Sequence, residues 1–307
     1  MIEIWYLCLF RSGFPLLPSV LKGYEISVIR IQSCLRSQFQ SLFLVLTLAM
    51  TWTPTSLSIG CAQTTARPRP KAAVVNTENF IVRVIELTNM ERVKAGVLPL
   101  KRQDDLCKAA HWLADDMATH NYFRHTDRTG RNIDLRLPYF GYKDFSTIGE
   151  NIAGGQVTPS AVVADWMKSP GHCANMLSPD FCEIGVAYVH VPNSESQDYW
   201  VQDFGSRFSV FPLIINLEAP QTSTPDVKLY VHGEHWAQKA RFSNDGLHWT
   251  DWEAFRPARE WQLETALGKH SVYVEMSNGK ETRHASASVE LVTNATLASA
   301  ANRTASH

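Results

Sequence analysis

The sequence has no excess of charge of either sign, because 29 lysines and arginines face 30 aspartates and glutamates, for a net charge of −1. A protein that binds nucleic acid normally presents a basic face, so no nucleic-acid partner is expected. Long apolar runs are missing too. The apolar stretch at residues 42–50 is far shorter than the about 20 residues that a membrane-spanning helix needs.

That apolar stretch follows basic residues and precedes small ones, a pattern typical of a secretory signal. Gly60 and Cys61 resemble the lipobox of bacterial lipoproteins, which predicts lipidation of Cys61; ordinary cleavage after Ala62 is the alternative. Either route exports the protein. A lipid on Cys61 is the only membrane attachment that is expected. A leader of residues 1–61 is about twice the usual 15 to 30 residues, which predicts a start codon placed too far upstream; a long leader is the alternative.

After the leader, residues 62–75 form a proline-containing basic linker, and residues 76–210 are predicted to form an α+β domain. Apolar residues recur with helical period in three segments, and β-branched and aromatic residues dominate two later ones. The predicted helices span 76–96, 104–120 and 158–169, and the predicted strands span 183–191 and 199–204.

A second linker near residues 218–224 leads into short β-like runs separated by Asn-Asp-Gly and Ser-Asn-Gly turns. These runs predict a small all-β sandwich over 225–292, followed by a disordered tail at 293–307. Four tryptophans of this part suggest either a platform for sugars or packing within a small sandwich, and packing is favoured. They are Trp236, Trp249, Trp252 and Trp261.

Cysteines are few in the part expected to fold, where only Cys107, Cys173 and Cys182 remain once Cys61 is assigned to the lipid. Export to an oxidising compartment favours one disulfide and one free thiol. A Cys107–Cys173 disulfide is predicted first, because it would tie distant segments together. A Cys173–Cys182 pair, which closes a short loop, is the alternative.

Five motifs of the first domain occur in an order that resembles the bacterial branch of the CAP superfamily. That superfamily, also called SCP/TAPS, is named for cysteine-rich secretory proteins, antigen 5 and pathogenesis-related proteins. The motifs are Phe123-Arg124-His125, Gly149-Glu150-Asn151-Ile152-Ala153, Trp166-x-x-Ser169-Pro170-Gly171-His172-x-x-Asn175, Glu183-Ile184-Gly185-Val186 and Tyr199-Trp200-Val201-Gln202-Asp203-Phe204-Gly205. The segment Phe242–Trp252 also resembles immunoglobulin-like tail domains of exported bacterial proteins.

The CAP resemblance implies an α-β-α sandwich with a central antiparallel sheet and one polar cleft. In eukaryotic members two histidines and two glutamates line that cleft and can hold a divalent metal. His125 matches the first histidine and Glu150 the first glutamate, whereas the other two positions fall near Ser169 and Tyr199. We expect His172 to supply the lost imidazole, aimed into the cleft by a helix stop at Pro170 and Gly171.

Three interpretations of His125, Glu150 and His172 stay open: a structural polar cluster, a site for zinc or a similar ion, and an acid–base catalytic group. The sequence predicts an exported binding or interaction module for a cell-envelope component, a lipid or an extracellular protein. The alternative is a metal-dependent or acid–base hydrolase acting on peptide or cell-wall substrates. Whether the protein is an enzyme is left open.

Overall fold

A computed structural model describes residues 77–298 of the chain. The predicted leader at 1–61, the linker at 62–75, the lipidation of Cys61 and the end of the tail lie outside the described residues. Within the described part, none of the helices combines the length and apolar character needed to span a bilayer.

The three predicted helices form where their periodicity placed them. Helix α2 (Thr77–Lys94) buries Phe80 and Val84, and α5 (Pro159–Lys168) starts with Thr158 accepting a hydrogen bond from the Ala161 amide. Proline at the first position of α5 fits there because that position needs no N–H. Helix α3 (Asp104–His120) follows Gln103, whose side chain caps the helix by accepting hydrogen bonds from two of its first amides.

Two further short helices were not expected. Helix α4 (Ile133–Tyr139) precedes the site, and α6 (Pro170–Leu177) follows α5 after one residue. Ser169 ends α5 with extended backbone and also precedes Pro170, the first residue of α6. The expected stop is therefore a junction between two helices, and His172 lies in the first turn of the second.

The central sheet has the order β1-β3-β4-β2. Strands β2 (Phe145–Gly154), β3 (Glu183–His190) and β4 (Asp198–Arg207) are antiparallel, and the short β1 (Lys101–Arg102) joins β3 in parallel. Side chains alternate along β4, with Trp200 and Phe204 in one core and Tyr199 and Val201 in another.

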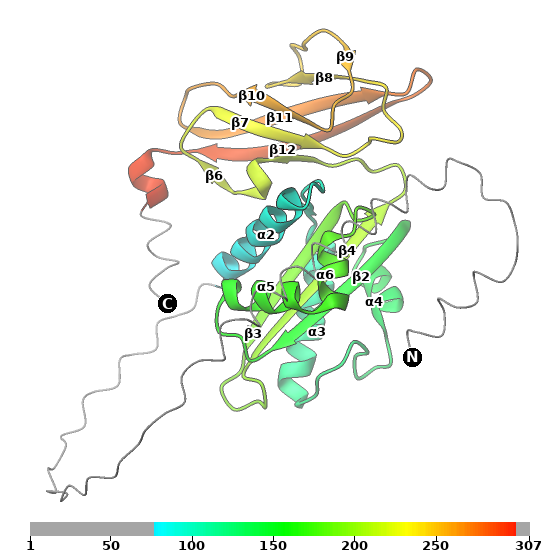
Figure 1. The fold of residues 1–307 in the computed structure, drawn as a ribbon, viewed down its shortest axis with the longest axis vertical. Helices are drawn as coiled ribbons and strands as arrows, with labels where there is room; N and C mark the ends of the chain where they lie inside the picture. The colour runs from blue at the N-terminus through cyan, green and yellow to red at the C-terminus, as the bar shows by residue number, and fades with distance from the viewer. Residues whose placement is uncertain (1–76, 299–307) are drawn as a thin grey trace, which may run out of the picture. The chain divides into compact units, whose positions relative to one another are not determined.

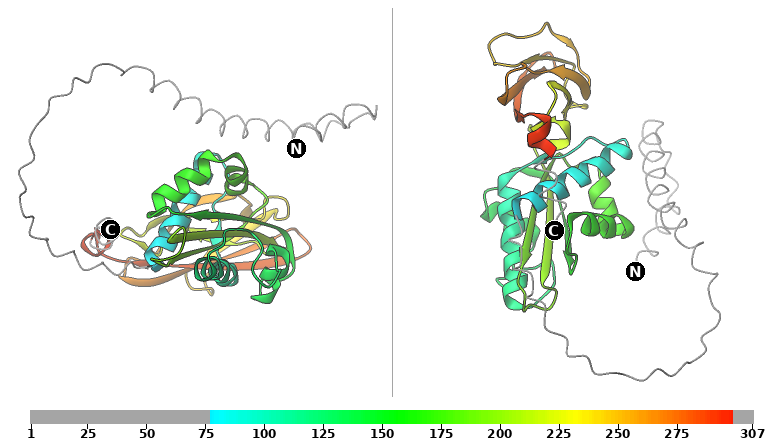
Figure 2. Two further views of the ribbon diagram at one scale, coloured as in Figure 1. Left: turned by 90° about the horizontal axis from the view of Figure 1, so that it is seen from below. Right: turned by 90° about the vertical axis from the view of Figure 1, so that its left-hand side faces the viewer.

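Helices cover both faces of this sheet, which confirms the predicted α-β-α sandwich. Residues of α2, α5 and α6 share one apolar cluster with the first face, whereas α3 packs on the second. Figure 1 shows these helices around the sheet, and the right-hand view of Figure 2 shows α3 on one side with α5 and α6 on the other. Strand β2 is one of the two edge strands, and α4 lies against it.

The rest of the described chain is a two-sheet β-sandwich with one shared apolar core. One sheet has the order β10-β7-β5 and the other β6-β12-β11-β8-β9. Its elements are β5 (Leu213–Ile215), β6 (Gln221–Thr222), β7 (Asp226–Val231), β8 (Lys239–Ser243), β9 (Glu253–Ala254), β10 (Ala258–Gln262), β11 (Gly268–Ser277) and β12 (Thr282–Leu291).

The sandwich includes more of the chain than the predicted 225–292. Strand β5, which lies before the predicted linker, pairs with β7, and β6, which lies within it, pairs with β12. Residues 294–298 form a helical turn where disorder was expected. Trp236 and Trp261 pack against the sandwich core, in agreement with the favoured packing interpretation. The immunoglobulin-like type of this sandwich stays a prediction.

The predicted disulfide between Cys107 and Cys173 is wrong, because Cys107 is a free thiol. Cys107 lies on α3 and Cys173 on α6, so the central sheet separates them. Cys182 is also free, which excludes the alternative pair with Cys173. Burial raises the pKa of the Cys107 and Cys182 thiols, so both are largely protonated at neutral pH.

Candidate functional site

The centre of the site is a pair of acids on neighbouring strands. Glu150 on β2 lies directly opposite Asp203 on β4 in the antiparallel register, so both carboxyls project from the same face. Asp203 is fully buried, and the Glu150 side chain is only 3 % exposed. Two buried acids this close to each other require a compensating charge or a shared proton.

Arg136 supplies the compensating charge. It belongs to α4, its side chain is fully buried, and its guanidinium is paired with the Glu150 Oε2 atom. The same nitrogen lies 3.8 Å from Asp203 Oδ1, and the other terminal nitrogen donates to the His125 carbonyl at 3.2 Å. Arg136 thus ties α4 to both strands and to the segment that carries His125.

The two acids differ in their protonation. Burial raises the pKa of Asp203 well above its ordinary value, and the charge of Glu150 raises it further. Burial also raises the pKa of Glu150, but Arg136 opposes this through direct contact. Within residues 77–298 neither Asp203 oxygen has an N–H or O–H donor. We therefore assign one proton to the pair, held by Asp203, with Glu150 ionised against Arg136.

His125 lies at the opening of the cluster. Its Nδ1 atom is 2.7 Å from Glu150 Oε1, and its side chain is 56 % exposed. An ionised Glu150 fixes the tautomer with the proton on Nδ1, which leaves Nε2 as an acceptor facing outward. Burial and the charge of Arg136 lower the pKa of His125, so the imidazole is neutral at pH 7.

His172 reaches the same region from the other face of β2. Its side chain is half-buried, and both this burial and the nearby His125 lower its pKa. The carbonyl of His172 accepts from Asn151 Nδ2 at 3.1 Å. Asn175 of α6 donates to Asn151 Oδ1 and to the Glu150 carbonyl. This amide network fixes the start of α6 on the edge strand.

The predicted residues are therefore brought to one region, but not as a set of metal ligands. His125 and Glu150 are in contact, and His172 is near enough to influence His125 electrostatically. Among residues 77–298, no group of three or more histidine, cysteine, aspartate or glutamate side chains is arranged to hold a metal ion. The buried guanidinium of Arg136 supplies the positive charge that a metal would bring. The residues as they stand do not fit the metal that the family resemblance implied.

Sequence reasoning missed Arg136 altogether and did not assign Asp203 a role. The sequence offers one signal for Arg136, namely that it lies between Leu135 and Leu137 in a short apolar stretch. The two other family positions carry no site chemistry, because Ser169 is the residue that joins α5 to α6 and Tyr199 is buried in the core.

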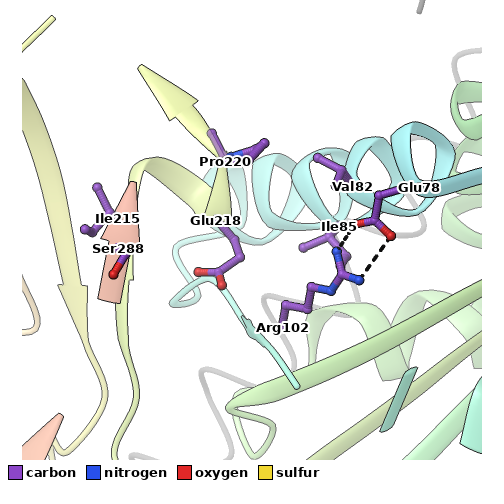
Figure 3. A pocket seen from close by; sticks show the side chains of 9 residues that line it. Glu78, Val82, Ile85, Arg102, Ile215, Glu218, Pro220 and Ser288 are labelled. Atoms are coloured by element: carbon purple, nitrogen blue, oxygen red, sulfur yellow. Dashed lines mark hydrogen bonds and ion pairs between the residues drawn. The ribbon is translucent and has the colours of Figure 1, made fainter. Parts of the chain in front are cut away.

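Away from this cluster, a hollow lies between α2, β1 and the segment after β5. The Glu78 carboxylate and the Arg102 guanidinium form an ion pair in it, as Figure 3 shows. Glu218 is paired with Lys101 at 2.7 Å. The remaining lining is mostly apolar: Val82, Ile85, Ile215, Ala219 and Pro220. Because the charged side chains that line this hollow are already paired, we assign it no binding or catalytic role.

Residues 85–204 match the family described as CAP, the cysteine-rich secretory protein family. Those residues form a CAP domain. The matched range contains the predicted site and its arginine, and it excludes the β-sandwich.

The CAP domain is 46 % identical over 123 residues to the uncharacterized protein YkwD of Bacillus subtilis (strain 168), covering 40 % of this chain and 45 % of that protein. It is 32 % identical over 125 residues to the uncharacterized membrane protein YlbC of the same organism, covering 41 % and 34 %. The chain thus spans less than half the length of each of these relatives.

Among solved structures, an extracellular protein containing a SCP domain from Bacillus anthracis is similar. The match has a TM-score of 0.40 and 24 % identity, and it covers 47 % of this chain and 45 % of that one.

Proposed function

We propose that the CAP domain is an exported binding module that holds a neutral, polar polymer of the cell envelope in its His/Glu cleft. The observation that carries this proposal is that two partly exposed imidazoles lie in one region and that one of them, His125, contacts the buried Glu150 carboxylate. His125 and His172 present hydrogen-bonding atoms, while Arg136 cancels the charge of Glu150 beneath them.

Such a surface suits hydroxyl and amide groups better than ions. A neutral imidazole can accept a hydrogen bond through one nitrogen and donate through the other. The glycan and peptide parts of a cell wall offer many partners of that kind. Export of the protein rests on the sequence of residues 1–61, and the lipid anchor on Cys61.

The test is co-sedimentation of the full chain with purified, insoluble peptidoglycan. We expect His125→Ala and His172→Ala each to weaken binding about tenfold, the effect of roughly 1.4 kcal/mol of lost hydrogen bonding. His248→Ala is the matched control, because that imidazole is 90 % exposed on the β-sandwich. Equal sedimentation of all variants would refute the proposal. Binding to vesicles of phosphatidylglycerol and phosphatidylcholine instead would favour a lipid.

One observation favours a second candidate, an acid–base hydrolase. The 2.7 Å contact of Glu150 with His125 Nδ1 orients the ring so that Nε2 can take a proton from water. Turnover would appear as soluble fragments released from peptidoglycan by the wild type and lost in His125→Ala. Binding of peptidoglycan without release of fragments would contradict the hydrolase and support the binding module.

A further inference from the structure

The guanidinium of Arg136 is a permanent part of the cleft. It is fully buried, it contacts Glu150, and it lies within 3.8 Å of Asp203. An arginine side chain does not lose its proton in a protein, so this charge cannot be removed by a change of pH. Moving it out would leave Glu150 buried without a cation, which is costly.

The groups around this guanidinium are those that zinc prefers. His125 contributes an imidazole, and Glu150 and Asp203 contribute carboxylates, a donor set found in zinc sites. Their bonding is also incomplete. Within residues 77–298, both Asp203 oxygens and the Arg136 Nε atom are buried without a hydrogen-bond partner. A cation at the guanidinium position would therefore meet the buried Asp203 carboxyl, which Arg136 itself approaches only to 3.8 Å.

We propose that Arg136 is the resident cation of this CAP cleft and excludes divalent metals from it. His125, Glu150 and Asp203 become a zinc site only when this positive charge is taken away. The inference does not depend on the polymer proposed above, because it concerns which cation the cleft accepts and not what binds at its surface.

The test replaces the charge while keeping the shape as far as possible. Arg136→Gln removes the cation, Arg136→Lys keeps one, and Arg131→Gln removes an arginine of the same region that is paired with Asp127 instead. Each full-length variant is titrated with zinc chloride, and binding is followed by calorimetry and by the imidazole NMR signals of His125.

We expect Arg136→Gln to bind one zinc ion on the order of 100-fold more tightly than the wild type, because the repulsion between the guanidinium and the metal ion is removed. Adding His125→Ala to Arg136→Gln should abolish that gain. The wild type, Arg136→Lys and Arg131→Gln should leave the His125 signals unmoved at equimolar zinc. The proposal is wrong if the wild type binds one zinc ion through His125, or if folded Arg136→Gln gains no affinity.

Loss of a buried arginine can also prevent folding. In that case zinc should restore the folded state of Arg136→Gln, since metal binding to a site that exists only in the folded chain drives folding. Far-ultraviolet circular dichroism with and without zinc measures this. An Arg136→Gln chain that stays unfolded in zinc would count against the proposal as firmly as a folded one that ignores the metal.

Discussion

At the scale of single residues, Gly185 determines how closely α3 approaches the sheet. A Cβ atom at this position of β3 would overlap the backbone of Leu106 and Cys107 at the start of α3. Backbone atoms cannot yield as a flexible side chain can, so the contact excludes every other residue. The glycine belongs to one of the motifs that indicated the family.

We expect Gly185→Ala to lower the free energy of unfolding by about 1–3 kcal/mol or more, the usual cost of overpacking a core. Gly171→Ala is the control, because a Cβ there meets nothing within 4 Å and alanine favours a helix. Urea denaturation of both variants measures the difference. A Gly185→Ala variant as stable as Gly171→Ala would contradict the close approach of α3.

The proton assigned to Asp203 gives a second residue-scale prediction. In Glu150→Gln, the pKa of Asp203 should fall, because the neighbouring charge that raises it is gone while Arg136 remains. The carboxyl ¹³C shift of Asp203, followed against pH, reports this directly. Glu218→Gln serves as control, since that buried acid is paired with Lys101. An Asp203 pKa that is unchanged in Glu150→Gln would show that Glu150 does not hold the charge.

The residues of the site differ in how far the sequence could reveal them. His125 and Glu150 stand in recognisable motifs, so their contact was expected. Arg136 stands in no such motif, and its importance arises only because α4 lies against β2. The role of Asp203 likewise depends on strand register, which places it opposite Glu150.

At the scale of elements, long periodic segments were predictable and short ones were not. Helices α2, α3 and α5 are long enough to show a repeating apolar face. Helix α4 has seven residues and contains Pro138, so no period can be recognised in it. The disulfide prediction failed for a related reason. The sequences of α3 and α6 do not reveal that these two helices pack on opposite faces of the sheet.

Helix α2 is attached to two neighbouring segments through the side-chain amide of one residue, Asn89. The buried Asn89 donates to the carbonyls of Leu100 and Leu217 and accepts from the Leu100 amide, all at 2.7–3.0 Å. Three polar backbone groups therefore depend on a single side chain. Leu217 itself has a left-handed backbone, with φ of 62°, which a leucine adopts only when its surroundings hold it there.

We expect Asn89→Ala to cost at least about 2 kcal/mol of stability, because it leaves buried backbone groups without partners. Arg83→Ala on the same helix is the control, since it removes an exposed ion pair with Glu86 worth at most about 1 kcal/mol. Thermal and urea unfolding measure both. A loss for Asn89→Ala no greater than that for Arg83→Ala would show that these bonds contribute little.

At the scale of the whole molecule, a buried histidine joins the two folded parts. His232, next to β7 of the sandwich, donates from Nε2 to the Pro99 carbonyl beside the CAP sheet, at 2.7 Å. Burial lowers the pKa of His232 to about 4. The folded chain thus resists protonating this ring at pH values where the unfolded chain accepts a proton readily.

Stability should therefore fall with acidification. The contribution of His232 is complete above its unfolded pKa near 6.5 and declines as the pH drops toward the folded pKa of about 4. Over that window the loss is about 3 kcal/mol. Denaturant titrations at several pH values should show a smaller loss in His232→Gln than in the wild type. Identical pH profiles for the two proteins would rule out this role.

The close approach at Gly185 has a consequence for how this domain can vary. At Gly185 the spacing between α3 and β3 is set by main-chain atoms. Substitutions that change the size of core side chains can therefore leave this spacing unaltered. Helix α3 starts from that fixed spacing and ends at His120, where the loop toward His125 begins. A lineage could thus repack its interior extensively while α3 kept its distance from the sheet.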